Sequence, residues 1–171
     1  MSNQRPRISF SPDGICSGCL NHERNNSINW DARLAELIDL LNDHRSNDGS
    51  WDVIVPSSGG KDSAYVAHQL KYEYGMNPLT VTWAPMSYTD IGASNFTAHL
   101  NAGFANIKYT PNRRLQRKLA RLCLEELGDA FHVFVLGQVC FPFHIALKLG
   151  ISLIFYGENG DFTSLLSVVE Y

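Results

Sequence analysis

One stretch of the sequence, residues 51–63, constrains the fold more than any other. It contains an apolar run at 53–55 that ends at Pro56, followed by a small, flexible segment at 57–60. From Lys61 onward, apolar residues recur at the spacing of a helix with one buried face. The pattern predicts a strand, a tight turn and the first turn of a helix.

The residues of this turn suit an anion. Backbone N–H groups at the start of a helix, together with the positive end of its dipole, attract negative charge. Gly59 and Gly60 allow the backbone to approach a ligand closely. Lys61 adds a positive charge, and Ser58 and Ser63 add hydroxyl donors. The turn therefore predicts a site for a phosphate group of a nucleotide.

Strands and helices are expected to alternate along the rest of the chain. Hydrophobic periodicity and Gly or Pro breaks predict helices at 32–42, 62–74, 90–104 and 112–127, and strands at 78–84, 106–110 and 151–156. Residues 131–136 are apolar enough for either a strand or a buried helix. Such alternation is typical of an α/β fold with a doubly wound, mainly parallel, Rossmann-like sheet.

Three residues outside the turn are expected to share its edge of the sheet. Ligands of parallel sheets bind beyond the C-terminal ends of the strands, where the following loops gather. This rule brings the turn close to Trp83 and to Glu158 and Asn159. Trp83 is a candidate neighbour of an adenine ring, and a core aromatic residue is an equal alternative.

The N-terminal part of the chain carries a pair of cysteines, Cys16-x-x-Cys19. A turn of this kind can present two thiolates to one tetrahedral zinc ion, and free thiols are the alternative. His22 is a candidate further ligand or a lone surface histidine. Nothing strand-like precedes the pair, which disfavours a redox motif. Cys123 lies in a predicted helix and Cys140 in an apolar stretch, and both are interpreted as buried thiols.

We divide the chain into an N-terminal extension, 1–48, with the cysteine pair and a helix, and a nucleotide-binding domain, 49–171. The net charge of −3 speaks against a dedicated nucleic-acid-binding protein. A basic cluster at 113–121 fits the solvated face of a helix, or a contact for an acidic or phosphorylated partner.

No apolar run approaches the ~20 residues of a membrane span, and the N-terminus lacks the apolar core of a signal peptide. The protein is therefore expected to be cytoplasmic.

The phosphate turn departs from two well-known loops and matches a third. A Walker A loop, G-x-x-x-x-G-K-[ST], would need glycine at Val55 and Ser or Thr at Asp62. The G-x-G-x-x-G fingerprint of dinucleotide-binding folds is absent from the sequence. Ser58-Gly-Gly-Lys-Asp-Ser63, directly after a predicted strand, instead resembles the S-G-G-x-D-S loop of the PP-loop ATP pyrophosphatases.

A longer series of motifs resembles that of one particular family within the PP-loop ATP pyrophosphatases. It comprises, in chain order, Cys16-x-x-Cys19, Ile-Asn-Trp-Asp-x-Arg at 28–33, the loop at 58–63, Leu-Thr-Val-Thr-Trp at 79–83 and Tyr-Gly-Glu-Asn at 156–159. The series is similar to that of the N-acetyl sugar amidotransferases, which act in the biosynthesis of surface polysaccharides such as lipopolysaccharide O-antigen and nonulosonic acids. That family favours Asp where this chain has Asn29. Its members are longer, so we expect this chain to be a fragment or to lack a C-terminal region.

The resemblance implies an ATP-dependent amidation in two steps. The acetamido oxygen of a nucleotide- or lipid-linked N-acetyl sugar would attack the α-phosphate of ATP and release pyrophosphate. Ammonia from a partner glutaminase would then displace AMP to form an acetamidino group. The implied cofactors are ATP, Mg²⁺ and, at Cys16 and Cys19, Zn²⁺.

The resemblance also assigns roles to individual residues. Lys61 and Asp62 are the implied catalytic residues. Lys61 would stabilise the departing pyrophosphate, and Asp62 would bind Mg²⁺ or only cap its helix. The implied ATP-binding residues are Ser58, Gly59, Gly60, Lys61, Asp62, Ser63, Trp83, Gly157, Glu158 and Asn159.

Two other functions stay open at this stage. A tRNA-thiolating PP-loop enzyme would need a basic RNA-binding face, which the net charge of −3 disfavours. A truncated module that binds ATP without turnover is the non-enzymatic alternative. Nucleic acid is therefore not the expected partner, and the sequence leaves open whether the protein forms a homo-oligomer.

Overall fold

The computed structural model describes residues 8–158 of the chain. The chain divides into two compact units, Met1–Leu40 and Leu41–Tyr171. The boundary lies inside helix α2 (Trp30–Asp43), whereas the sequence analysis placed it between residues 48 and 49. Each unit is described by itself.

The first unit contains a helix that the sequence analysis did not predict. Phe10 and Cys16 form an isolated antiparallel bridge, and α1 (Ser17–Asn26) begins directly after it. Helix α2 follows, and the side-chain oxygen of Asn29 accepts a hydrogen bond from the N–H of Ala32 at 3.1 Å. Asn29 therefore caps α2.

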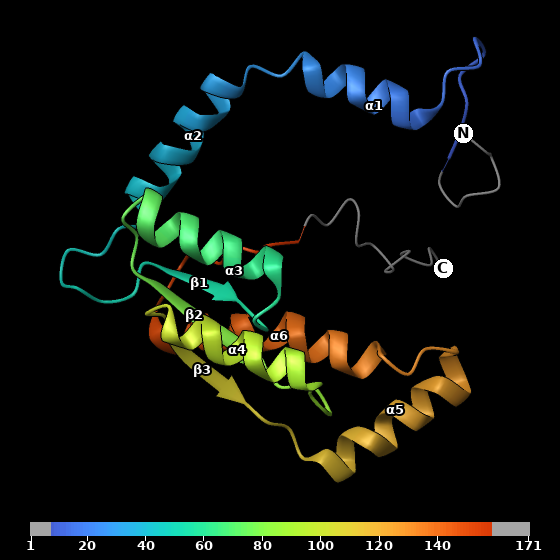
Figure 1. Cartoon of the computed structure of the whole chain (residues 1–171), viewed down its shortest axis with the longest axis vertical. Coiled ribbons are helices and arrows are strands. Elements are labelled where there is room, and N and C mark those ends of the chain that lie inside the picture. The colour runs from blue at the N-terminus through green and yellow to red at the C-terminus, as the bar shows by residue number, and fades with distance from the viewer. Residues whose placement is uncertain (1–7, 159–171) are drawn as a thin grey trace. The chain divides into compact units, whose positions relative to one another are not determined.

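The second unit is a mixed α/β structure built on a three-stranded parallel sheet with the order β1-β2-β3. Val55 on β1 pairs with Thr80 on β2, and Thr80 pairs with Asn106 on β3. Among the described residues the elements of this unit, shown in Figure 1, are β1 (Val53–Pro56), α3 (Lys61–His68), the π-helical turn η1 (Gln69–Glu73), β2 (Pro78–Trp83), α4 (Asp90–Asn101), β3 (Ala105–Tyr109), α5 (Arg113–Leu127) and α6 (His132–Leu149). The predicted alternation of strands and helices and the parallel pairing are confirmed.

One face of the sheet packs against α6. Paired residues of neighbouring strands point to the same side, as do residues two apart on one strand. Ile54 pairs with Leu79, and Ile107 pairs with Val81, so all four share this face. They form an apolar core with Phe141 and Ala146 of α6. Burial of this cluster holds α6 against β1 and β2.

The opposite face carries α4. Lys108 of β3 lies on this side, and its ammonium group sits 4.9 Å from the ring centroid of Phe96. The His68 ring of α3 lies 4.9 Å from the ring of Phe104, which follows α4, so α3 runs beside α4. Helices therefore cover both faces of the sheet. The start of α3 follows the end of β1 after a short loop.

The prediction of a regular strand at 151–156 is wrong. It pairs with β1 at one residue, Ile154, in a parallel bridge to Ile54. The N–H of Ile54 donates to the Leu153 carbonyl at 2.9 Å, and the N–H of Phe155 donates to the Ile54 carbonyl at 2.8 Å. A sequence that favours a strand forms a regular strand only where several successive residues pair with a neighbouring strand. Here the pairing with β1 is limited to Ile154.

The ambiguous segment 131–136 belongs to a helix. The apolar pattern continues through α6 until Gly150, which adopts a left-handed conformation and ends the helix. A run of this length exceeds that of an ordinary strand, although periodicity over six residues could not show it. By length and composition, α6 is also the one helix among residues 8–158 that could cross a membrane, a test that core helices of soluble proteins pass as well.

Candidate functional site

The segment from Ser57 to Ser63, which we call the 57–63 loop, joins β1 to α3. Ser57, the first residue of the loop, is hydrogen-bonded to β2 through both its N–H and its carbonyl group. The N–H of Ser57 donates to the Val81 carbonyl at 2.9 Å, and the hydroxyl of Thr82 donates to the Ser57 carbonyl at 2.5 Å. These two bonds anchor the start of the loop at the C-terminal edge of the sheet.

Gly59 is required at its position for two reasons. Its φ of +83° lies in the left-handed region that other residues rarely adopt. A Cβ atom there would also lie 2.8 Å from the Cα atom of Phe96 on α4. Gly60, by contrast, has a φ of −72° and room for a Cβ atom. The sequence analysis gave both glycines the same role, whereas in the structure only the position of Gly59 requires a glycine.

The start of α3 has no side-chain cap. Gly60 occupies the N-cap position and has no side chain with which to cap the first-turn N–H groups. Lys61 and Asp62 form an ion pair of 2.6 Å, and both side chains are largely exposed, at 87% and 59%. The helix therefore presents backbone donors, a cation and a carboxylate together at one end, where its dipole favours an anion.

A buried polar cluster lies beneath the 57–63 loop. The hydroxyl oxygens of Ser57 and Ser63 are 3.2 Å apart, and Nε2 of His99 is 3.3 Å from the Ser57 oxygen. All three side chains belong to buried residues. His99 was missed by the sequence analysis, because a histidine in an amphipathic helix carries no signal of what it will face.

The predicted closeness of Gly157 to the loop is borne out in the geometry. A Cβ atom on Gly157 would lie 2.8 Å from both the carbonyl carbon of Asp62 and the nitrogen of Ser63. Glu158, the next residue, is exposed. Asn159, also predicted to bind ATP, lies outside the described residues. The chain after Ile154 thus runs directly against the start of α3.

Tyr156, which precedes this contact, is tied to α6. Its hydroxyl donates to the Val139 carbonyl at 3.4 Å. Burial raises the pKa of Tyr156, and the nearby carboxylate of Glu158 raises it further. The phenol is therefore neutral at ordinary pH and acts as a hydrogen-bond donor.

Trp83 lies at the end of β2 on the face that packs against α6. Its ring stacks on Tyr109 with centroids 5.0 Å apart and lies 5.8 Å from the ring of Phe141. A Cβ atom on Gly137 would overlap the indole, so a glycine is needed there. Trp83 therefore has the contacts of a core aromatic residue, and its role beside adenine stays a prediction.

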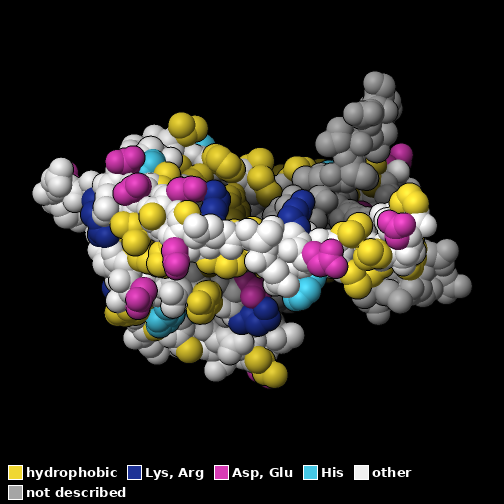
Figure 2. Space-filling model, turned by 90° about the horizontal axis from the view of Figure 1, so that it is seen from above, with side chains coloured by type: hydrophobic (Ala, Val, Ile, Leu, Met, Phe, Trp, Pro, Cys, Tyr) yellow, Lys and Arg dark blue, Asp and Glu magenta, His cyan; other side chains and the backbone are white. Residues whose placement is uncertain are grey.

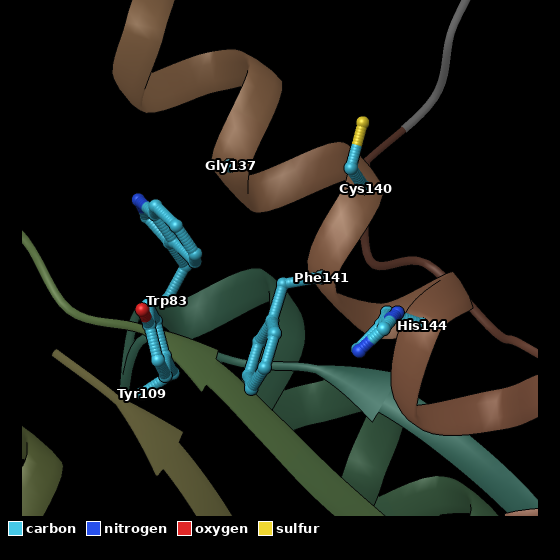
Figure 3. A pocket seen from close by; sticks show the side chains of 6 residues that line it. All are labelled: Trp83, Tyr109, Gly137, Cys140, Phe141 and His144. Carbon is cyan, nitrogen blue, oxygen red and sulfur yellow. The ribbon is translucent and has the colours of Figure 1, made fainter. Parts of the chain in front are cut away.

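A pocket of about 420 Å³ opens beside Trp83, between the sheet and α6 (Figure 3). Among the described residues, the indole Nε1 of Trp83 is buried without a hydrogen-bond partner. The pocket wall also holds Cys140, which is exposed. The interpretation of Cys140 as a buried thiol is therefore wrong, and Cys123 is half-buried. The pocket is lined by Trp83, Tyr109, Gly137, Cys140, Phe141 and His144.

The cysteine pair begins a helix. Cys16 is the N-cap of α1, and its sulfur accepts a hydrogen bond from the N–H of Cys19 at 3.3 Å. The bridge between Phe10 and Cys16 is a single-residue contact, and no regular strand precedes the pair among the described residues. The two sulfurs lie 3.4 Å apart. The N–H bond from Cys19 lowers the pKa of Cys16, whereas the hydrogen bond with Cys16 raises the pKa of Cys19.

This geometry supplies half of a tetrahedral zinc site. Two sulfurs on one helical turn suit a shared metal ion, and structural zinc takes four ligands. Within residues 8–158, no group of three or more His, Cys, Asp or Glu side chains is placed to hold a metal ion. His22, the candidate further ligand, is 3.3 Å from the side-chain amide of Asn26 on the same helix. Zinc on the cysteine pair therefore stays a prediction.

Comparison with known proteins adds no assignment. A scan against models of protein families finds no match, and a search of curated proteins finds no similar sequence.

Proposed function

We propose that this chain is a PP-loop ATP pyrophosphatase, the synthetase part of an N-acetyl sugar amidotransferase. The observation that carries the proposal is the 57–63 loop. It follows a parallel strand, requires glycine at Gly59, and leads into a helix whose first turn is uncapped. A polyphosphate anion is the ligand that such a turn is best suited to bind.

The chemistry follows from what each group offers. The N–H groups at the start of α3 and the ammonium group of Lys61 would bind the β- and γ-phosphates and stabilise the charge that develops as pyrophosphate departs. The exposed carboxylate of Asp62 is a suitable oxygen ligand for Mg²⁺, which would share that charge. Gly157 brings the following residue, Glu158, to the same end of the helix, where its carboxylate would orient ATP or the acceptor.

The acceptor is proposed from the sequence series that accompanies the loop. An N-acetyl sugar would be adenylylated on its acetamido oxygen, and ammonia from a glutaminase would displace AMP. A role in tRNA thiolation is disfavoured by charge. On the face seen in Figure 2, basic and acidic side chains are interspersed and form no continuous basic surface.

Pyrophosphate release tests the proposal. Purified protein is incubated with ATP, Mg²⁺ and an ammonium salt, together with a UDP-linked N-acetyl sugar, a lipid-linked one or bulk tRNA. We expect release that depends on an N-acetyl sugar and is unchanged by tRNA. Stimulation by tRNA alone would favour the thiolation function, and ATP binding without release under all three conditions would identify a binding module.

A further inference from the structure

We infer that His99 is a positioning residue, which orders the 57–63 loop through a chain of hydrogen bonds that runs in one direction. The inference deepens the proposed function by naming what holds the phosphate site in shape. It rests on the cluster of Ser57, Ser63 and His99, whose exposed fractions are 5%, 5% and 4%. Side chains buried to this degree make most of their hydrogen bonds within the protein, so we assign each proton to a protein acceptor.

The direction of the chain follows from counting protons. A serine hydroxyl has one proton to donate. The Ser63 hydroxyl donates to the Gly60 carbonyl at 3.2 Å, so between the two serines it must accept, and Ser57 is the donor. Ser57 has then used its proton, and its oxygen must accept from Nε2–H of His99. The N–H of Gly59 also points to the Ser57 oxygen, at 3.4 Å.

This count assigns the state of His99. Nε2 carries a proton, and Nδ1 is buried without a partner among the described residues. A proton on Nδ1 would be an unpaired buried donor, so the ring is neutral with its proton on Nε2. The ring is fixed in place by Phe104, on which it stacks with centroids 4.8 Å apart and an interplanar angle of 10°.

The surroundings favour the same neutral state. Burial lowers the pKa of His99, and the charge of His68 on α3 lowers it further. Lys71 Nζ lies 5.2 Å from the Phe104 ring, on which His99 stacks, so the nearby charges are positive. A neutral donor from α4 thus fixes Ser57, Ser57 fixes Ser63, and Ser63 holds the Gly60 carbonyl at the N-cap of α3. The first-turn N–H groups, which no side chain of the N-cap residue Gly60 caps, are the groups that we propose to bind phosphate.

Two substitutions separate positioning from packing. His99→Phe keeps an aromatic ring on Phe104 and removes the donor, whereas His99→Gln supplies an amide donor to Ser57. We expect His99→Phe to raise the dissociation constant for Mg-ATP and the KM for ATP about tenfold, and His99→Gln to recover most of the loss. His132→Gln is the matched control on α6. Thermal unfolding shows whether each variant is folded.

Two outcomes overturn the inference. Wild-type ATP affinity in folded His99→Phe would show that the donor is not needed. Additive losses in His99→Phe and Ser57→Ala, measured alone and combined, would show that the two residues do not act as one chain.

A nitrogen NMR spectrum of the histidine-labelled protein tests the chain without ATP. It should show His99 protonated on Nε2 and bare on Nδ1 at neutral pH. The opposite tautomer would refute the inference even if the protein proved to have another function. An Nε2–H signal without any ATP binding would instead reject the proposed function and leave the hydrogen-bond chain standing.

Discussion

Gly157 packs directly against the backbone of Asp62, so closely that a Cβ atom would come within 2.8 Å of the Asp62 carbonyl carbon. Asp62 follows β1, and Gly157 follows the residue that bridges to β1, Ile154. β2 and β3 extend from one edge of β1, and Ile154 bridges to its other edge. Ligands of parallel sheets bind beyond the C-terminal ends of the strands, and the 57–63 loop lies at the C-terminal end of β1.

Gly157→Ala should therefore disturb the site through backbone contact alone. The added methyl group must displace either the start of α3 or the segment around Tyr156. We expect a lower thermal midpoint and weaker Mg-ATP binding in equilibrium titration. Unchanged values for both would show that this contact is loose in solution.

Gly59→Ala and Gly60→Ala form a matched pair for stability. Alanine at 59 would adopt a left-handed conformation, which costs about 1–3 kcal/mol, and would also meet Phe96. Alanine at 60 keeps an ordinary φ and meets the Ser58 hydroxyl at 3.4 Å. Denaturant unfolding should show a large loss of unfolding free energy for the first and a small change for the second. Equal losses would contradict the backbone assignment.

Lys61→Ala and Asp62→Asn should abolish pyrophosphate release without unfolding the protein. Both side chains are exposed, and a surface ion pair contributes only about 0–1 kcal/mol to stability. Activity and the thermal midpoint are measured in parallel, with Lys148→Ala as the control on α6. Wild-type turnover in both variants would remove the PP-loop assignment.

Metal analysis of the purified protein tests the cysteine pair. The two sulfurs, 3.4 Å apart, would supply two of the four ligands of a structural zinc. We expect about one zinc per chain, or per dimer if two chains each supply a pair. Cys16→Ser should lose the metal and Cys140→Ser should keep it. A metal-free wild type of equal stability would refute the site.

Stability should fall with decreasing pH in a way that depends on His99. Its folded-state pKa lies below its ordinary value of 6.5, because burial and His68 disfavour the charged ring. The unfolded chain therefore binds the proton first, and stability is lost as the pH falls through 6.5 until the folded-state pKa is reached. Thermal midpoints across this range should vary more in the wild type than in His99→Gln. Identical pH profiles would show that His99 titrates normally.

Much of the local structure could be predicted because it depends on neighbours in sequence. The apolar run before Pro56, the helical spacing after Lys61 and the glycine that ends α5 at Gly128 each act over a few residues. The same holds for Asn29, whose side chain bonds three residues along the chain. Chain order and the rule for parallel sheets then placed Gly157 near the loop, as the contact with Asp62 bears out.

Only the tertiary structure decided the rest, because those features depend on what a segment meets. Residues 131–136 fit a strand or a buried helix by their composition, and the structure places them at the start of α6, whose later residues cover Ile54 and Leu79. The segment around Ile154 has the composition of a strand, but β1 pairs with it at one residue. His99 became part of the site because α4 places it under Ser57. The sequence alone determined that a glycine-containing loop joins the first strand to a helix, and long-range packing determined which groups hold that loop in place.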